Sequence, residues 1–177
     1  MFDRRAIEEL YDYTSFAWAM VAQTCRALPE GTIAKPAPGS GWPSLRDAFR
    51  HMLGAMDGWL HYTLEYGPLI DPSNEALATW DGIEDYRAKV HATMRRLLDE
   101  TPDERLFELF TRVYDEDGPE TMSLGDIIAN LLLHERGHHG DPTTLFWQLG
   151  IEQPALDYRQ YVYLKRHADS PYRPPGW

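Results

Sequence analysis

The sequence is poor in cysteine, in basic residues and in long hydrophobic runs, and each shortage argues against a class of protein. Cys25 is the only cysteine among 177 residues, so the chain forms neither an intrachain disulfide nor a multi-cysteine metal site. Lys and Arg number 17 against 28 Asp and Glu, which gives a net charge of −11. This acidic balance argues against nucleic-acid binding and against an anionic membrane surface. No stretch approaches the roughly 18 uninterrupted apolar residues of a membrane-spanning helix.

The residues that are present indicate a folded protein. A content of 43% hydrophobic and 12% aromatic residues is enough for a sizeable core, and 25% charged residues is too few for disorder. We predict one domain over residues 1–177, with a bundle over about 3–150 and an aromatic, proline-rich tail over 151–177. Acidic residues near the start, where a secretory signal needs apolar ones, predict a cytoplasmic protein. Cys25 falls on an apolar helical stripe and is expected to be a buried core residue.

Hydrophobic periodicity predicts an all-α fold, a four-helix bundle. The four helices are expected over residues 3–28, 44–66, 83–100 and 123–150, with a short fifth helix near 157–166. Ser44 and Ser123 are each followed three residues later by an aspartate, which is a helix-capping pattern. The Pro/Gly-rich stretch 29–43 is predicted as a loop long enough for a crossover. Residues 107–119 are predicted as a short hairpin or an irregular excursion.

Two histidines replace the leucines expected on the inward stripe of the fourth predicted helix. That stripe runs through Ile127, Leu131, His134, His138, Leu145 and Leu149. Side chains four residues apart share one helical face, so His134 and His138 can hold one divalent cation. His51, on a side of the second helix with small neighbours, is the best third ligand. The alternative is that these are core histidines bonded to carbonyl groups.

The other four histidines fit a metal site less well. His91 shares a face with two arginines, which predicts a solvated position. His61 is turned about 80° from His51 on an ideal helix and is not expected to join the same site. His139 and His167 are expected at the surface or behind the ligands.

Residues 134–138, His-Glu-Arg-Gly-His, match the H-E-x-x-H pattern of zinc proteases, in which the glutamate activates water. The extended form of that pattern needs Gly at 141 and His at 144, where this chain has Asp141 and Thr144. A later ligand could only be Glu152 or Asp157, and the strand-rich lobe of these proteases has no counterpart in the sequence. A zinc metalloprotease is therefore the less favoured alternative.

Together these motifs resemble the DinB/YfiT-like family over nearly the whole chain, most strongly from 44 to 66 and from 118 to 163. The features that carry the resemblance are His51, Leu124-Gly125-Asp126, His134, His138, Leu149-Gly150 and Leu156-Asp157-Tyr158. The resemblance implies an up-down-down-up bundle, frequent homodimers and a divalent metal held by three histidines. Those histidines map onto His51, His134 and His138.

Family members with an assigned activity include transferases and isomerases that use low-molecular-weight thiols. The resemblance therefore predicts a small-molecule enzyme, a hydrolase or a thiol S-transferase, that uses Zn, Ni or Fe. The alternative is a non-catalytic or structural bundle in which the ion ties the second helix to the fourth. Glu135 is the best nearby general base, and a surface carboxylate is the alternative interpretation of this residue.

One departure from the family pattern follows the last ligand, where the family has His-Arg-Gly-Gln and this chain has His-Gly-Asp-Pro. Pro142 cannot donate a hydrogen bond to the carbonyl of His138. We therefore expect a kink there, or a new helix capped by Asp141. Asp47 and Asp126 are expected either to close the helix caps or to orient a ligand histidine.

Overall fold

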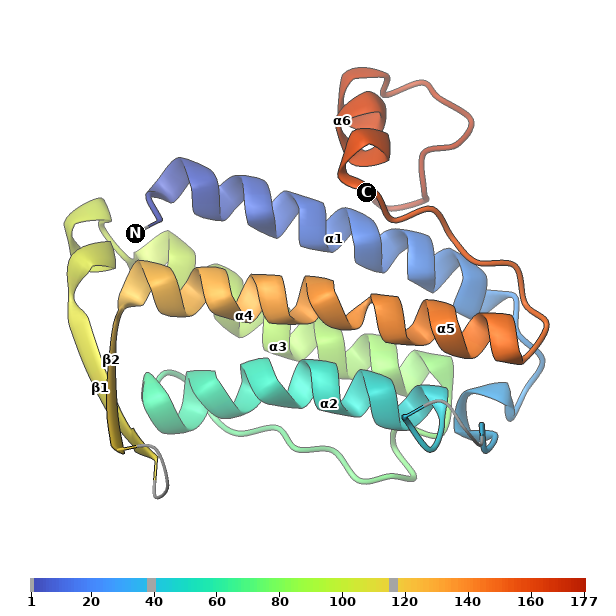
Figure 1. Ribbon diagram of the computed structural model, residues 1–177, viewed down its shortest axis with the longest axis horizontal. Coiled ribbons are helices and arrows are strands. Elements are labelled where there is room, and N and C mark those ends of the chain that lie inside the picture. The colour runs from blue at the N-terminus through green and yellow to red at the C-terminus, as the bar shows by residue number, and fades with distance from the viewer. Residues whose placement is uncertain (1, 38–40, 115–117) are drawn as a thin grey trace.

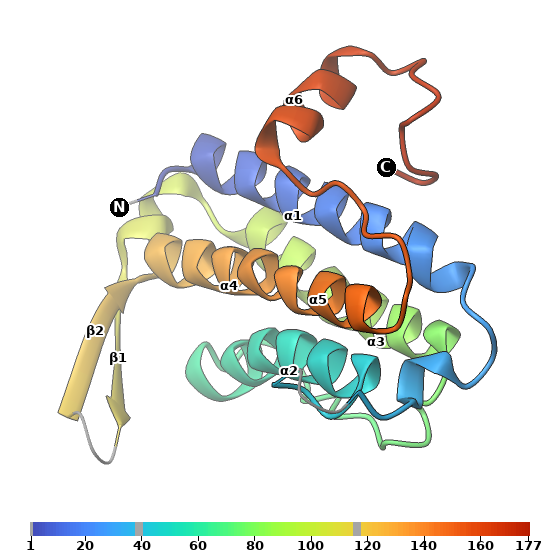
Figure 2. The ribbon, with the colours of Figure 1, turned by 45° about the vertical axis from the view of Figure 1, so that its right-hand side comes forward.

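The structure, a computed structural model, describes residues 2–37, 41–114 and 118–177. Its body is helical, and the long helices lie side by side (Figure 1 and Figure 2). They are α1 (Arg4–Arg26), α2 (Leu45–Gly58), α3 (Trp80–Glu100) and α4 (Leu124–His138), with α5 (Gly140–Gln148) continuing α4. The four predicted long helices are thus confirmed, the last one in two parts. The up-down-down-up order stays a prediction.

Both predicted serine caps form. The backbone N–H of Asp47 donates to Ser44 Oγ at 3.3 Å, and this hydroxyl donates to the Asp47 carboxylate at 2.5 Å. In the same way, the backbone N–H of Asp126 donates to Ser123 Oγ at 3.1 Å, and this hydroxyl donates to the Asp126 carboxylate at 2.7 Å. Each pair satisfies backbone groups that the first helical turn leaves without partners. The caps therefore set where α2 and α4 begin. They thereby also fix the positions of the three predicted ligand histidines along these helices.

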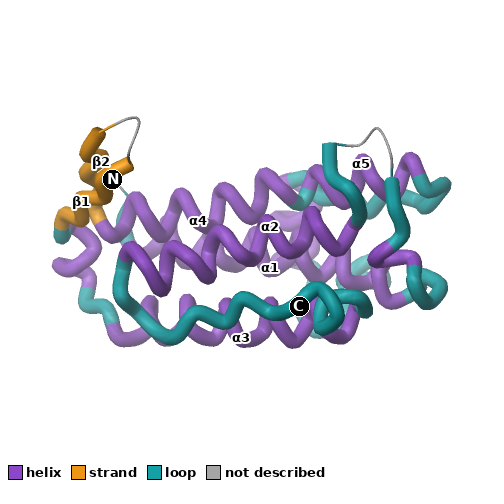
Figure 3. Tube along the Cα trace, turned by 90° about the horizontal axis from the view of Figure 1, so that it is seen from below, coloured by secondary structure: helices purple, strands orange, loops and turns teal. Residues whose placement is uncertain are grey.

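The segment before α4 is a hairpin. Strands β1 (Leu109–Tyr114) and β2 (Gly118–Ser123) pair antiparallel, with Leu109 opposite Ser123 and Tyr114 opposite Gly118. They lie at one end of the helical body (Figure 3). This confirms the hairpin alternative, although residues 115–117 of its predicted turn lie outside the described residues. Because Ser123 ends β2 and caps α4, the hairpin leads into the helix that carries two of the predicted ligands.

A buried carboxylate anchors α2 to α3. The α-helical part of α2 continues as a π turn over Trp59–Thr63. Asp57 accepts hydrogen bonds from the backbone N–H groups of Ile70 and Asp71 and from the hydroxyl of Tyr86 in α3. Three donors compensate for the burial of this charge. The helix that carries His51 is thereby held in a defined position.

Apolar side chains of the long helices form the main core. Its fully buried members include Val21, Phe49, Leu53, Ile83, Val90, Ile128 and Leu132. Cys25 is buried among them and burial raises the pKa of its thiol, which confirms the predicted core position. Helix α6 (Tyr158–Arg166) confirms the predicted tail helix and packs its Tyr161 against Phe16 of α1. Among the described residues, no helix is long and apolar enough to cross a membrane.

Candidate metal centre

The three predicted ligand histidines meet between α2 and α4. One ring nitrogen from each of His51, His134 and His138 lies within 4.8 Å of the other two. The ring centroids are 4.3 Å apart for His134 and His138, 4.7 Å for His51 and His138, and 5.4 Å for His51 and His134. Three nitrogens bound to one ion at about 2.0–2.1 Å would lie about 3.4 Å apart, so modest ring rotations suffice to close the site. His51 is exposed and the other two are half-buried, so the cluster is open to solvent.

The surroundings of His51 and His134 favour the neutral form of their imidazoles. Burial lowers the pKa of His51, and the proximity of His138 lowers it further. The pKa of His134 is lowered by burial and then by its two histidine neighbours. Neutral imidazole is the form that binds metal, because a proton occupies the same lone pair. The trio therefore fits a divalent ion in number and atom type, and the lowered pKa values of His51 and His134 favour the form that binds it.

A carboxylate lies behind one ligand. Asp141 Oδ2 is 2.7 Å from His138 Nδ1, so the ring donates there and leaves Nε2 available to an ion. The predicted candidates for such a role, Asp47 and Asp126, close helix caps instead. The signal for Asp141 is its spacing of three residues from a ligand histidine, which places both side chains on one helical turn.

An indole borders the histidines on the loop side. Trp42 precedes α2, and its ring centroid lies 4.8 Å from that of His51 and 6.0 Å from that of His138. Its Nε1–H donates to Asp141 Oδ2 at 2.8 Å. The predicted loop 29–43 therefore contributes to the site through Trp42, while its residues 38–40 lie outside the described residues.

The regular helix is interrupted just beyond the three histidines. Helix α4 ends at His138 and α5 begins at Gly140, so a new helix starts before Pro142 and continues α4, whereas the expected kink stays a prediction. The predicted cap by Asp141 is wrong, because α5 starts without a side-chain cap hydrogen bond. The carboxylate of Asp141 bonds His138 and Trp42 instead. Pro142 thus follows the interruption of the helix, and Asp141 contacts the candidate site.

Glu135 points away from the trio, towards α3. Its Oε2 accepts a hydrogen bond from His91 Nε2 at 2.8 Å, and its Oε1 is 3.7 Å from Arg87 Nε. Burial acts to raise the pKa of Glu135, but His91 and Arg87 outweigh it and lower the pKa to about 2. The side chain is fully buried, so the surface-carboxylate interpretation is wrong. The structure does not bring Glu135 into the trio, and its general-base role stays a prediction.

The expected solvated position of His91 is wrong. His91 is 5% exposed, and its Nδ1 is 3.3 Å from the hydroxyl of Tyr11. Because Nε2 donates to Glu135, Nδ1 accepts from that hydroxyl. One of the two arginines on the same face, Arg87, is itself mostly buried beside Glu135. The Arg87–Glu135 ion pair between α3 and α4 places charged residues on a buried helix face. In the sequence, such a face has the same charge pattern as a face exposed to solvent.

The remaining histidines are now placed. His139 is fully buried, with Nε2 3.8 Å from Glu135 Oε1, so the expected surface position is wrong. Burial lowers the pKa of His139 to about 3. His61 bonds the carbonyl of Gly67 and does not join the trio, as predicted. His167 is exposed in the tail, also as predicted.

This geometry does not favour the protease interpretation. In that mechanism the glutamate of H-E-x-x-H faces the bound ion. Here Glu135 faces α3, and the third histidine comes from upstream, in α2. Asp157, a candidate later ligand, caps α6 by accepting from the N–H of Gln160.

Comparison with known families agrees with the motif and the geometry. The DinB family matches residues 1–172. The chain belongs to the DinB family. The resemblance seen in its motifs is thereby confirmed, and the histidine trio of this DinB-family chain lies within the matched region. No curated protein matches the chain.

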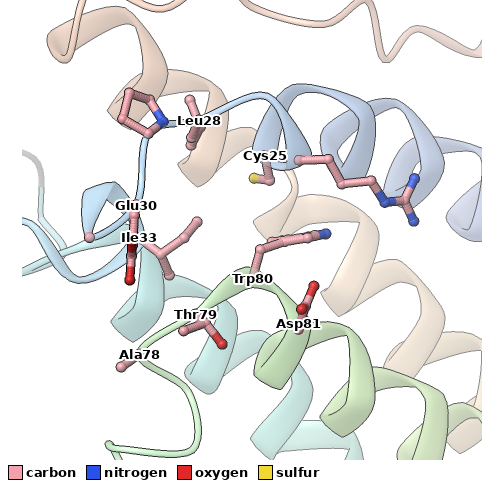
Figure 4. A pocket seen from close by; sticks show the side chains of 11 residues that line it. Cys25, Leu28, Glu30, Ile33, Ala78, Thr79, Trp80 and Asp81 are labelled. Carbon is pink, nitrogen blue, oxygen red and sulfur yellow. The ribbon is translucent and has the colours of Figure 1, made fainter.

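A separate pocket of about 160 Å³ lies where α1 ends and α3 begins (Figure 4). Cys25, Thr79 and Trp80 are among its lining residues, and none of the three ligand histidines is. Because burial raises the pKa of the Cys25 thiol, this group is not an activated nucleophile. The pocket therefore carries no chemistry comparable with that of the trio.

Proposed function

We propose that this chain is a divalent-metal-dependent enzyme, a hydrolase or a thiol S-transferase, on an up-down-down-up four-helix bundle. The observation that carries the proposal is the convergence of three imidazoles, those of His51 and His134 with lowered pKa values, on a solvent-open side of the molecule. Imidazole ligands suit Zn, Ni and Fe alike. A divalent ion held by three protein ligands supplies a Lewis acid with positions left for substrate atoms.

The residues around the trio have separate tasks in this proposal. His51, His134 and His138 hold the ion, and Asp141 orients the ring of His138. The exposed side of His51 gives a small molecule, such as a low-molecular-weight thiol, access to the site. Glu135 faces α3. It can act as a general base only if a substrate proton reaches it on that side of α4. A cytoplasmic homodimer belongs to the same proposal.

The competing proposal is a structural ion that ties α2 to α4. Its support is that the ligands come from these two helices. Against it, the two helices already share an extensive apolar core that includes Phe49, Leu53 and Leu132. Burial of such side chains contributes about 1.5–3 kcal/mol each, so we expect the fold to form without an ion.

Metal analysis tests the proposal directly. The purified protein should hold one divalent ion per chain, and His51→Ala should lose it while keeping the helical circular dichroism of the parent. Full retention of metal by His51→Ala would show that the ligand assignment is wrong. After EDTA treatment the protein should stay folded, whereas the structural alternative predicts unfolding.

Access to the ion is tested with Co²⁺ in place of the native metal. Adding 2-mercaptoethanol should change the visible absorption of the Co²⁺ protein, because a thiolate enters an open coordination position. A spectrum that stays unchanged at saturating thiol and at high azide would exclude a catalytic site of this kind.

A further inference from the structure

One oxygen atom joins two parts of the candidate site that are far apart in the sequence. Asp141 Oδ2 accepts from His138 Nδ1 at 2.7 Å and from Trp42 Nε1 at 2.8 Å. Both lengths are those of strong hydrogen bonds to a charged acceptor. Asp141 is therefore shared between a ligand and the loop that precedes α2.

The ring contacts of Trp42 make this shared bond relevant to the ion. The indole lies beside His51 of α2 as well as His138 of α4. An indole that is free to rotate would not keep one position against two imidazoles, and its Nε1–H bond to Asp141 restricts that rotation. The carboxylate thus fixes the ring next to both ligands.

We propose that Asp141 is a positioning residue that couples Trp42 to the metal centre. It holds His138 with Nε2 towards the ion, and through the same oxygen it holds the indole as a wall beside His51. This inference rests on the proposed metal site and adds to it a carboxylate and an indole. Trp42 acts through Asp141, so the effects of removing each are not independent.

A simpler role for Asp141 makes a different prediction. An acidic side chain in the first turn of a helix stabilises the positive end of the helix dipole. Asp141 occupies the first turn of α5, and Asp81 occupies the first turn of α3. If the dipole were the only role, Asp141→Asn and Asp81→Asn would both lower stability slightly and leave the histidines and the indole unchanged. Asp81→Asn is therefore the matched control.

The first measurement uses EDTA-treated protein. In NMR spectra with ¹⁵N labelling, Asp141→Asn should shift the ring nitrogens of His138 and speed solvent exchange of the Trp42 indole proton. Asp81→Asn should change neither signal, and Trp42→Phe assigns the indole resonance. Unchanged His138 and Trp42 signals in Asp141→Asn would overturn the coupling.

The second measurement is Ni²⁺ affinity by calorimetry in the full chain. Loss of a carboxylate behind a ligand histidine lowers metal affinity by about 10–100-fold, and we expect this for Asp141→Asn. Trp42→Phe should weaken binding less. The double variant should match Asp141→Asn alone, because the indole acts through that carboxylate.

Two results would overturn the inference while leaving the metal site intact. One is parental Ni²⁺ affinity in Asp141→Asn, and the other is strict additivity of the two substitutions. A parent protein that binds no Ni²⁺ would instead refute the proposed function together with this inference. Quenching of tryptophan fluorescence by Ni²⁺ gives a further check, since it should persist in the control Trp147→Phe and be much reduced in Trp42→Phe.

Discussion

Helix α4 and His139, the residue directly after it, carry two groups of ionisable residues on neighbouring faces, and the environments of the two groups are opposite. The ligand face consists of His134 and His138 and meets His51 of α2 in a cluster open to solvent. The α3-facing cluster consists of Glu135 and His139 together with Arg87 and His91, and it is buried. Each face offers potential metal-binding side chains four residues apart. The two groups therefore differ in how far their side chains are buried and in the charges beside them, and less in residue type.

The difference lies in where the compensating charge comes from. In the α3-facing cluster, the carboxylate of Glu135 already has a cation, Arg87, 3.7 Å away and a donor, His91, at 2.8 Å. A divalent ion there would compete with a guanidinium that is part of the core. The ligand face and His51 together offer three ring nitrogens in a cluster open to solvent, so an incoming ion would meet nitrogen lone pairs. The comparison predicts metal binding at the ligand face and a stabilising role for the α3-facing cluster.

The strongest test of this division is Glu135→Gln. The amide keeps the shape of the side chain but leaves the buried Arg87 without its counter-charge. Breaking a buried ion pair on one side costs about 3–5 kcal/mol, so we expect a loss of that size in the free energy of unfolding. Urea denaturation of EDTA-treated protein measures it.

The same variant should bind Ni²⁺ with nearly parental affinity, because Glu135 is not among the ligands. If Glu135→Gln kept full stability and lost metal binding, Glu135 would belong to the ligand face and the division would fail. If it bound metal normally but lost only turnover, the predicted general-base role would gain direct support.

His138→Ala should show the reverse pattern. Removing one of three ligands should lower Ni²⁺ affinity by more than the roughly 100-fold upper range for a residue behind a ligand. The imidazole is only partly buried, so the metal-free melting temperature should change little. Calorimetry and thermal denaturation measure the two effects, and a large loss of metal-free stability would show that the ligand face also supports the fold.

The sequence alone was enough to predict the ligand face and not the cluster behind it. Two histidines four residues apart on an apolar stripe are informative within one helix, and the small neighbours of His51 indicated room for a third. His91 was assigned to solvent because a single helix does not reveal that Arg87 pairs with Glu135 on another helix. Trp42 and Asp141 are far apart in the chain, and no local pattern predicts contacts of that range. Local periodicity therefore predicted the histidine cluster that the structure brings together, whereas the contacts of Trp42, Arg87 and His91 depend on tertiary pairing.

His139 gives the α3-facing cluster its own contribution to the pH dependence of stability. Burial lowers its pKa to about 3, whereas unfolded His139 has its ordinary pKa near 6.5. Between these values the unfolded chain binds a proton that the folded chain does not, so stability falls as the pH falls. The slope from this group is about 1.4 kcal/mol per pH unit, or about 2 kcal/mol between pH 6.5 and 5.

Replacing His139 with Gln should remove that contribution. Urea denaturation of EDTA-treated parent and variant from pH 7 to pH 4.5 measures the difference in slope. Equal slopes for the two proteins would mean that His139 is protonated without penalty in the folded state, and that the α3-facing cluster is more accessible than its burial indicates.

The smallest expected effect comes from Tyr11→Phe at the edge of the α3-facing cluster. The hydroxyl of Tyr11 donates to His91 Nδ1 across 3.3 Å, a long bond, and His91 in turn donates to Glu135. Losing one such bond should cost about 1 kcal/mol in the free energy of unfolding, measured by urea denaturation. Ni²⁺ affinity should not change, because Tyr11 contacts His91 of the α3-facing cluster and not the three histidines of the candidate site. A Tyr11→Phe protein of parental stability but weaker Ni²⁺ binding would connect the two faces through α4 and contradict the separation of their roles.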